Sequence, residues 1–192
     1  MMLAGRVLWL ALPVVLGGAV HVGVIKLDWL PTLARVPLDG GATFRGRRVL
    51  GANKTVRGVA VMVPATIVFV LAQALLFRHY AWARSASLVD FDRLRPALWG
   101  AVLGGGYVAG ELPNSFAKRQ LAVPPGGRPP GGLGILFWLI DQVDSLLGVL
   151  AGMWLVWAPP VAVAALLCGL TLIVHPAVAL VMVKLGLKRR IG

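Results

Sequence analysis

The stretches GELPNSFAKRQ (Gly110–Gln120) and LIDQVDSLLG (Leu139–Gly148) decide the fold, because each places acidic residues within or beside a long apolar run. Glu111, Asp141 and Asp144 are three of only seven acidic residues in the chain. Ionisable side chains are costly in hydrocarbon, so they mark a functional site by default. A spacing of three residues places Asp141 and Asp144 on one face of a helix. The two stretches therefore predict one site shared by two membrane helices.

The composition is that of an integral membrane protein with one domain, residues 1–192. Of its residues, 58% are hydrophobic and 14% are charged, which is unlike a soluble domain. The formal net charge is +12, and the cations gather at the ends of apolar runs. This pattern indicates membrane topology and phosphate binding, so we expect no nucleic-acid partner. Cys168 is the only cysteine, which excludes a disulfide framework and a cysteine metal site.

Five apolar runs are long enough to cross a bilayer, which takes about 20 residues each. We expect an all-α, polytopic fold with spans at Leu3–Ile25, Val59–Phe77, Pro96–Phe116, Ile135–Trp157 and Val161–Leu185. Lys and Arg divide 14 to 5 between the two sides, and the richer side is cytoplasmic. The richer side includes Lys184, Lys188, Arg189 and Arg190 near the C-terminus. We therefore expect an external N-terminus, a cytoplasmic C-terminus, cytoplasmic loops at about 28–57 and 117–134, and a place in the cell (inner) membrane.

The acids are expected at matching depths on neighbouring helices. Glu111 lies about five residues before the end of the third span, and Asp141 about six after the start of the fourth, or roughly 8–9 Å from the cytoplasmic rim. Pro113 is expected to break or kink the helix near Glu111, or simply to end it early. Three pairs of glycines spaced by four residues predict tight packing of these spans. The pairs are Gly100 and Gly104, Gly106 and Gly110, and Gly148 and Gly152.

The first cytoplasmic loop combines glycines with cations in LDGGATFRGRRVLGANKTVRG (Leu38–Gly58). Glycine lets backbone amides approach a phosphate, and cations neutralise it. The candidate phosphate ligands are Arg45, Arg47, Arg48, Lys54 and Arg57, with Asn53 and Thr55 beside them at the start of a helix, where the helix dipole favours anions. A turn-and-anchor role for this loop stays open. His175, before Pro176, is interpreted as part of a kink rather than as a ligand.

These segments together resemble the CDP-archaeol synthase family, five-span membrane cytidylyltransferases distantly similar to CDP-diacylglycerol synthases. The most specific parts are Ser115-x-x-Lys118-Arg119 and Asp141-Gln142-x-Asp144. The resemblance implies transfer of a cytidylyl group from CTP to a membrane lipid phosphate, with Mg²⁺ and release of pyrophosphate. The family pattern has Asp where this chain has Glu111, and often a basic residue at the position of Gln120.

On this resemblance, we expect Asp141, Asp144 and Glu111 to hold Mg²⁺. Lys118 and Arg119, with Lys54 and Arg57, would position phosphates, while Ser115 would donate a hydrogen bond. Gln142 and the loop residues would complete the substrate site. Two alternatives remain: a small cation transporter, whose acids would lie near the bilayer midplane, and a non-catalytic scaffold with the same fold.

Overall fold

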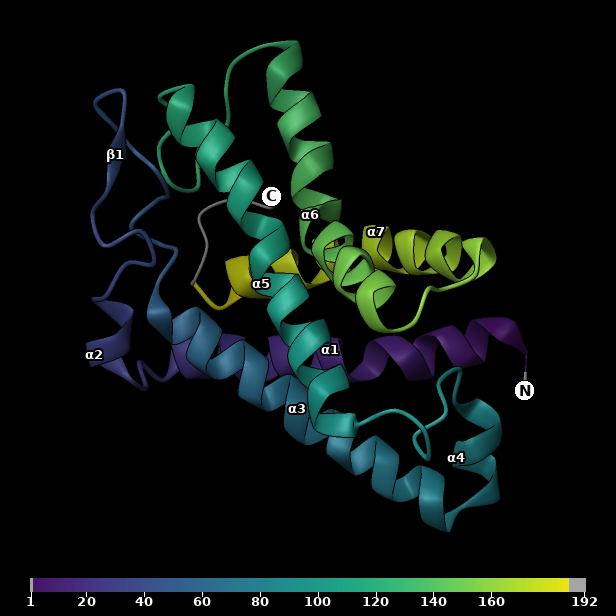
Figure 1. The fold of residues 1–192 in the computed structure, drawn as a ribbon. Helices are drawn as coiled ribbons and strands as arrows, with labels where there is room; N and C mark the ends of the chain where they lie inside the picture. Colours follow the sequence, from purple (N-terminus) through teal and green to yellow (C-terminus); the bar gives the residue numbers. More distant parts are fainter. Residues whose placement is uncertain (1, 187–192) are drawn as a thin grey trace.

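The computed structural model describes residues 2–186, and Figure 1 shows long helices crossing one another with a small hairpin at one end. In chain order the elements are α1 (Leu3–Lys26), α2 (Pro31–Ala34), β1 (Thr43–Phe44), β2 (Arg47–Arg48), α3 (Val56–His79), α4 (Ala81–Ala86), α5 (Pro96–Gln120), α6 (Gly132–Val156) and α7 (Val161–Lys184). The expected helical fold is confirmed, with a two-stranded hairpin added. Lys188, Arg189 and Arg190, which entered the predicted topology, lie outside the described residues.

Four of the described helices, α1, α3, α6 and α7, are long and apolar enough to cross a membrane. Each of the five apolar runs in the sequence coincides with one long helix. The fifth helix, α5, has 25 residues, or about 37 Å at the usual rise of about 1.5 Å per residue. Its last turns carry polar side chains, which lower its hydropathy. The protein is therefore a multi-pass membrane protein.

Helix α5 occupies the centre of the fold, with α3 on one side and α6 on the other. Glycines make both contacts close. A Cβ on Gly106 would lie 2.6 Å from the carbonyl oxygen of Gly148 on α6, and one on Gly100 would lie 2.6 Å from Cα of Ile67 on α3. Real side chains do not tolerate such distances. The predicted packing of the third and fourth spans is confirmed for the pairs Gly106/Gly110 and Gly148/Gly152. For Gly100 and Gly104 it was wrong, because these two glycines pack α5 against α3 instead.

The predicted break or early helix end at Pro113 was wrong, because α5 is continuous from Pro96 to Gln120; a kink at this position stays a prediction. Proline removes one backbone hydrogen bond, and a helix packed on both sides retains enough other contacts to continue. The acids also lie further from the helix ends than expected. Glu111 is nine residues from the end of α5, and Asp141 nine residues from the start of α6. The two distances match, at about 13 Å along each helix.

The first connection folds around Asp39. Its carboxylate accepts hydrogen bonds from the Arg48 side chain and from the backbone N–H groups of Gly41 and Leu50. The Arg48 guanidinium and these N–H groups lower the pKa of Asp39 to about 2. Strands β1 and β2 pair Thr43 with Arg48. This network gives the glycine-rich loop a defined shape.

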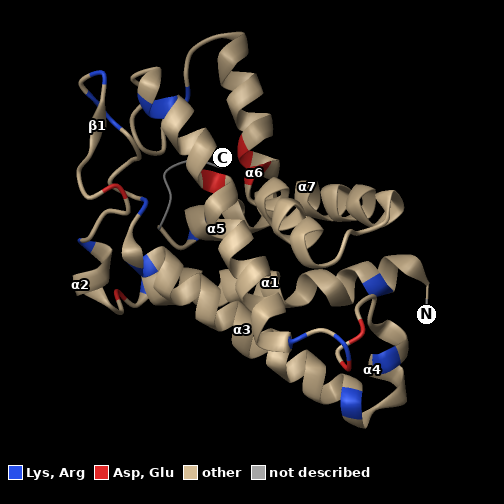
Figure 2. Ribbon diagram, in the orientation of Figure 1, with Lys and Arg blue, Asp and Glu red and all other residues tan. Residues whose placement is uncertain are grey.

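The hairpin is attached to the end of α5. Arg47 donates a hydrogen bond to the backbone carbonyl of Gln120, and Gln120 Nε2 donates to the carbonyl of Arg48 at 3.3 Å. Figure 2 shows Lys and Arg in the hairpin region and near the last turns of α5, with further cations at the opposite end around α4. The loop that was expected to bind phosphate is therefore held next to the helix that carries Glu111.

Candidate active site

Asn114 on α5 joins the two aspartates of α6. Its Nδ2 donates hydrogen bonds to Asp141 Oδ1 at 2.6 Å and to Asp144 Oδ2 at 2.7 Å. Ser145 makes the second link, since its Oγ lies 3.1 Å from Glu111 Oε1 and 3.2 Å from Asp144 Oδ1. Because α5 and α6 approach each other closely at their glycines, the short side chains of Asn114 and Ser145 are long enough to connect the two helices. The three predicted acids thus belong to one hydrogen-bonded cluster.

Two lysines neutralise this cluster from opposite directions. Lys54, from the first connection, forms an ion pair with Glu111. Lys118 lies two turns after Glu111 on α5 and donates to Asp141 Oδ2 at 2.6 Å. Both ammonium groups are mostly buried, with 20% and 12% of their side chains exposed. A buried charge is tolerated only when it is paired, so these contacts stabilise the site in the absence of a ligand.

Arg119 differs from the two lysines in its hydrogen bonding. Its Nε and Nη1 are buried, and within the described part of the chain they have no hydrogen-bond partner. A Cβ on Gly51 would lie 3.1 Å from Arg119 Nη1, so the glycine-rich loop approaches the guanidinium closely. Buried polar groups are normally hydrogen-bonded. An unpaired buried guanidinium beside a polar pocket is a binding group for an anion.

A polar pocket of about 180 Å³ joins these groups. Eight of the predicted site residues line it: Asn53, Lys54, Glu111, Ser115, Lys118, Arg119, Asp141 and Asp144. Gly126 and Gly127, from the connection between α5 and α6, also line it. The pocket thus combines three carboxylates with three cations at the junction of two loops and the helices α5, α6 and α7.

The remaining predicted residues lie elsewhere. Gln142 is buried against α7 rather than in the polar pocket, and its Oε1 lies 3.1 Å from His175 Nδ1. The arginines of the first connection have partners outside the pocket: Arg45 lies over the Phe44 ring, Arg47 contacts Gln120 at the end of α5, Arg48 pairs with Asp39, and Arg57 pairs with Asp28 at 3.2 Å. Thr55 precedes α3 as its N-cap. Substrate contacts by these residues stay predictions.

The metal-binding capacity of the site depends on its donor atoms. Among residues 2–186, no three His, Cys, Asp or Glu side chains are grouped closely enough to hold a metal ion in the present arrangement. The carboxylate oxygens of Asp141 and Asp144 at present accept hydrogen bonds from Lys118 and from the Asn114 amide nitrogen. Asn114 Oδ1 is buried without a partner in the described structure, and carboxylate and amide oxygens are the ligands that Mg²⁺ accepts. The donor set therefore fits Mg²⁺.

A model of the CarS-like CDP-archaeol synthase family matches residues 5–191. The chain belongs to the CDP-archaeol synthase family. This membership confirms the resemblance found in the sequence and favours an enzyme over a transporter or a non-catalytic scaffold.

Individual relatives agree with the family assignment. The CDP-archaeol synthase of Halorubrum lacusprofundi is 32% identical over 160 residues, which cover 79% of this chain and 81% of the relative. That of Aeropyrum pernix is 31% identical over 159 residues, covering 81% and 78%. A solved structure described as an intramembrane enzyme for archaeal membrane lipid biosynthesis matches with a TM-score of 0.61 and 26% identity. It covers 90% of this chain and 92% of the solved chain.

Three residues of this CDP-archaeol synthase family site were missed in the sequence. Asn114 and Ser145 stand directly within the quoted motifs, and their helical spacing from Glu111 and Asp144 could have indicated a shared face. His175 lines the polar pocket from α7, where the sequence suggested only a kink; α7 is continuous through Pro176. An imidazole inside an apolar run was itself the signal.

Proposed function

We propose that the protein transfers a cytidylyl group from CTP to a membrane lipid phosphate and releases pyrophosphate. An oxygen of the lipid phosphate attacks the α-phosphorus of CTP, and the bond between that phosphorus and the oxygen leading to the β-phosphorus breaks. The leaving group departs as pyrophosphate. The observation that carries the proposal is the polar pocket, where three carboxylates and three cations meet inside a membrane protein of this family.

The side chains of the pocket have separate roles in this proposal. Arg119, whose Nε and Nη1 are buried without a partner among the described residues, receives the triphosphate, and Lys54 and Lys118 exchange their carboxylates for phosphate oxygens. Ser115, one turn after Glu111, donates to the same group of oxygens. No general base is needed, since a lipid phosphate is already anionic near neutral pH. Fixed cations around a transferring phosphoryl group stabilise the charge that develops there.

We propose that Mg²⁺ is held by Asp141 and Asp144, with Glu111 and the Asn114 amide oxygen assisting. When bound, the ion would neutralise phosphate charge in the pocket. Lys54 and Lys118 balance the charges of Glu111 and Asp141, while Asp144 is hydrogen-bonded to Asn114 and Ser145. Substrate binding would release these acids from their present partners.

We further propose five spans, with the N-terminus outside and the active site facing the cytoplasm. Helix α5 lies between α3 and α6, both of which are apolar enough to cross, and about 37 Å of helix exceeds a hydrocarbon core of about 30 Å. The polar end of α5 joins the basic hairpin, as the rule of positive cytoplasmic loops requires. Replacing Cys168 and introducing one cysteine at Arg45 or at Ser85 tests this, because only the second should react with an impermeant reagent from outside.

The proposed activity is tested with purified protein, CTP, Mg²⁺ and a lipid phosphate. We expect pyrophosphate release that depends on all three additions and falls at least about 100-fold in Asp144→Asn. The matched control is Asp92→Asn, which lies in the α4–α5 connection away from the pocket. Absence of pyrophosphate with every lipid phosphate offered would contradict the proposal.

A further inference from the structure

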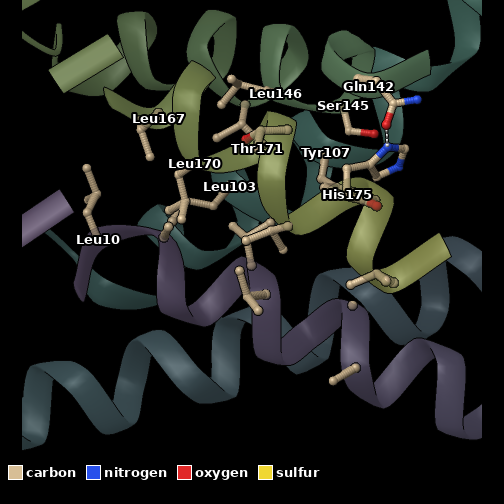
Figure 3. A pocket seen from close by; sticks show the side chains of 18 of the residues that line it. Leu10, Leu103, Tyr107, Gln142, Ser145, Leu146, Leu167, Leu170, Thr171 and His175 are labelled. Atoms are coloured by element: carbon tan, nitrogen blue, oxygen red, sulfur yellow. Dashed lines mark hydrogen bonds between the residues drawn. The ribbon is translucent and has the colours of Figure 1, made fainter. Parts of the chain in front are cut away.

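A second cavity, of about 190 Å³, lies between α1, α5, α6 and α7. Figure 3 shows leucines of all four helices pointing into it, among them Leu10, Leu103, Leu146 and Leu170. A water molecule needs only about 10–15 Å³ of such space, and apolar cavities of about 150 Å³ stay dry and bind apolar ligands. The chemistry of the walls therefore fits hydrocarbon rather than water or nucleotide.

Most polar side chains of the cavity lie toward one end, and Thr171 is set among the leucines. Tyr107, Gln142, Ser145 and His175 lie together at that end in Figure 3, with the contact between Gln142 and His175 drawn. Because Gln142 Nε2 donates to the carbonyl of Trp138, its Oε1 is the acceptor and His175 Nδ1 carries the proton. An apolar chamber with a polar mouth matches an amphiphile that has one charged end.

This mouth is continuous with the active site. His175 lines both the cavity and the polar pocket. Ser145 lines the cavity and also contacts Glu111 and Asp144. A molecule whose phosphate lay in the polar pocket would need to pass only these side chains to place its tail among the leucines.

We propose that the cavity holds one hydrocarbon chain of the lipid phosphate, with its head group leaving the cavity past His175 and Gln142. The inference rests on the proposed function, since it supplies the lipid that the reaction consumes. The rival position is a groove along α5 and α6, lined by Gly105, Ala109 and Leu147, which also reaches Asn114 and Asp144. The cavity is favoured because it is walled by four helices and because Tyr107, Gln142, Ser145 and His175 lie together at one end, where His175 also lines the polar pocket.

Two glycines provide a matched pair of variants. Gly18 lines the cavity and Gly105 lines the rival groove; a Cβ at either would meet nothing within 4 Å. Gly18→Phe fills the cavity and Gly105→Phe fills the groove, with the same chemical change in a helix. We expect Gly18→Phe to raise the KM for a long-chain lipid phosphate by about tenfold or more. For a water-soluble short-chain lipid phosphate and for CTP, the KM of Gly18→Phe should stay within about twofold of wild type. The KM values of Gly105→Phe should stay within the same range for all three substrates.

The proposal is overturned if Gly105→Phe has the chain-length effect instead, or if Gly18→Phe affects long and short chains equally. A second readout does not need turnover or a variant: a lipid phosphate with a photoreactive group in its chain is cross-linked to the wild-type protein. Labelled peptides from α1 and α7 support the cavity, and labels confined to α5 and α6 overturn it. If the wild type releases no pyrophosphate while α1 and α7 are labelled, the proposed function fails and the lipid site stands.

Discussion

Lys54, just before the start of α3, forms an ion pair with Glu111, which lies nine residues before the end of α5. This contact connects the glycine-rich loop to the acidic cluster across 57 residues of sequence. It also gives a physical reason for glutamate at a position where the resemblance to the family led us to expect aspartate. The additional methylene lets the carboxylate reach the lysine of the loop while remaining near Ser145.

The coupling between these two residues is measurable in a double-mutant cycle. We expect Lys54→Met and Glu111→Gln each to lower the free energy of unfolding by about 1–3 kcal/mol, because each leaves a partly buried charge without its partner. The double variant should cost less than the sum by about 1 kcal/mol. Chemical denaturation in detergent measures this, with Arg93→Met, in an exposed pair, as the control. If the two single-variant effects add up strictly, the Lys54–Glu111 ion pair does not stabilise the protein.

Arg119 should show opposite effects on stability and on binding. Its buried, unpaired N–H groups cost free energy in the ligand-free protein, so Arg119→Met should raise the unfolding free energy by about 1 kcal/mol. The same change should weaken CTP binding by about tenfold or more, since a charge-assisted contact is lost. Lys118→Met is the comparison, because it leaves Asp141 unpaired and should destabilise the protein. An Arg119→Met protein that is less stable and binds CTP normally would refute the anion-binding role.

Two adjacent glycines on α5 should respond differently to alanine. Gly106→Ala places a methyl group 2.6 Å from the Gly148 carbonyl oxygen and should destabilise by about 1–3 kcal/mol through overpacking. Gly105→Ala meets nothing within 4 Å and should stabilise by about 0.5–1 kcal/mol, since alanine is the better helix former. Thermal unfolding in detergent compares the two. Equal effects would mean that α5 and α6 are not in close contact.

The Asp39 network predicts a pH dependence for the hairpin loop. The pKa of Asp39 is about 2 in the folded loop, against an ordinary value of 3.8. A lowered pKa contributes stability that is complete above the ordinary value and is lost as the pH falls toward the folded value. Hydrogen exchange of residues 41–50, corrected for intrinsic rates, should therefore stay slow above about pH 4 and accelerate toward about pH 2. Asp39→Asn should exchange fast at every pH, and slow exchange in that variant would contradict the network.

The sequence was sufficient for the helices and for the shared acidic site, because both depend on signals within single helices. Apolar runs define the helices, and Glu111, Asp141 and Asp144 are conspicuous within or beside them. The loop cations could not be placed in the same way. Sequence alone does not distinguish the roles of the four arginines. Only the folded structure shows that Arg45 contacts Phe44, Arg47 contacts Gln120, Arg48 contacts Asp39 and Arg57 contacts Asp28.

Pro113 and His175 show a second limit. A proline predicts a helix end only when the helix depends on its own hydrogen bonds, and α5 is supported by α3 and α6. His175 belongs to a helix that was predicted correctly, but its contact with Gln142 depends on how α7 packs against α6. Tertiary packing decided both positions, and neither local pattern contains that information.

The most direct test of the central claim follows the α-phosphorus of CTP. Purified protein is incubated with a lipid phosphate, Mg²⁺ and CTP that carries a radioactive label on either the α- or the γ-phosphorus. We predict that the α-label enters the lipid extract, that the γ-label stays in water as pyrophosphate in equal amount, and that Asp144→Asn does neither. Label in the water phase alone, or full transfer by Asp144→Asn, would contradict a cytidylyl transfer at this pocket.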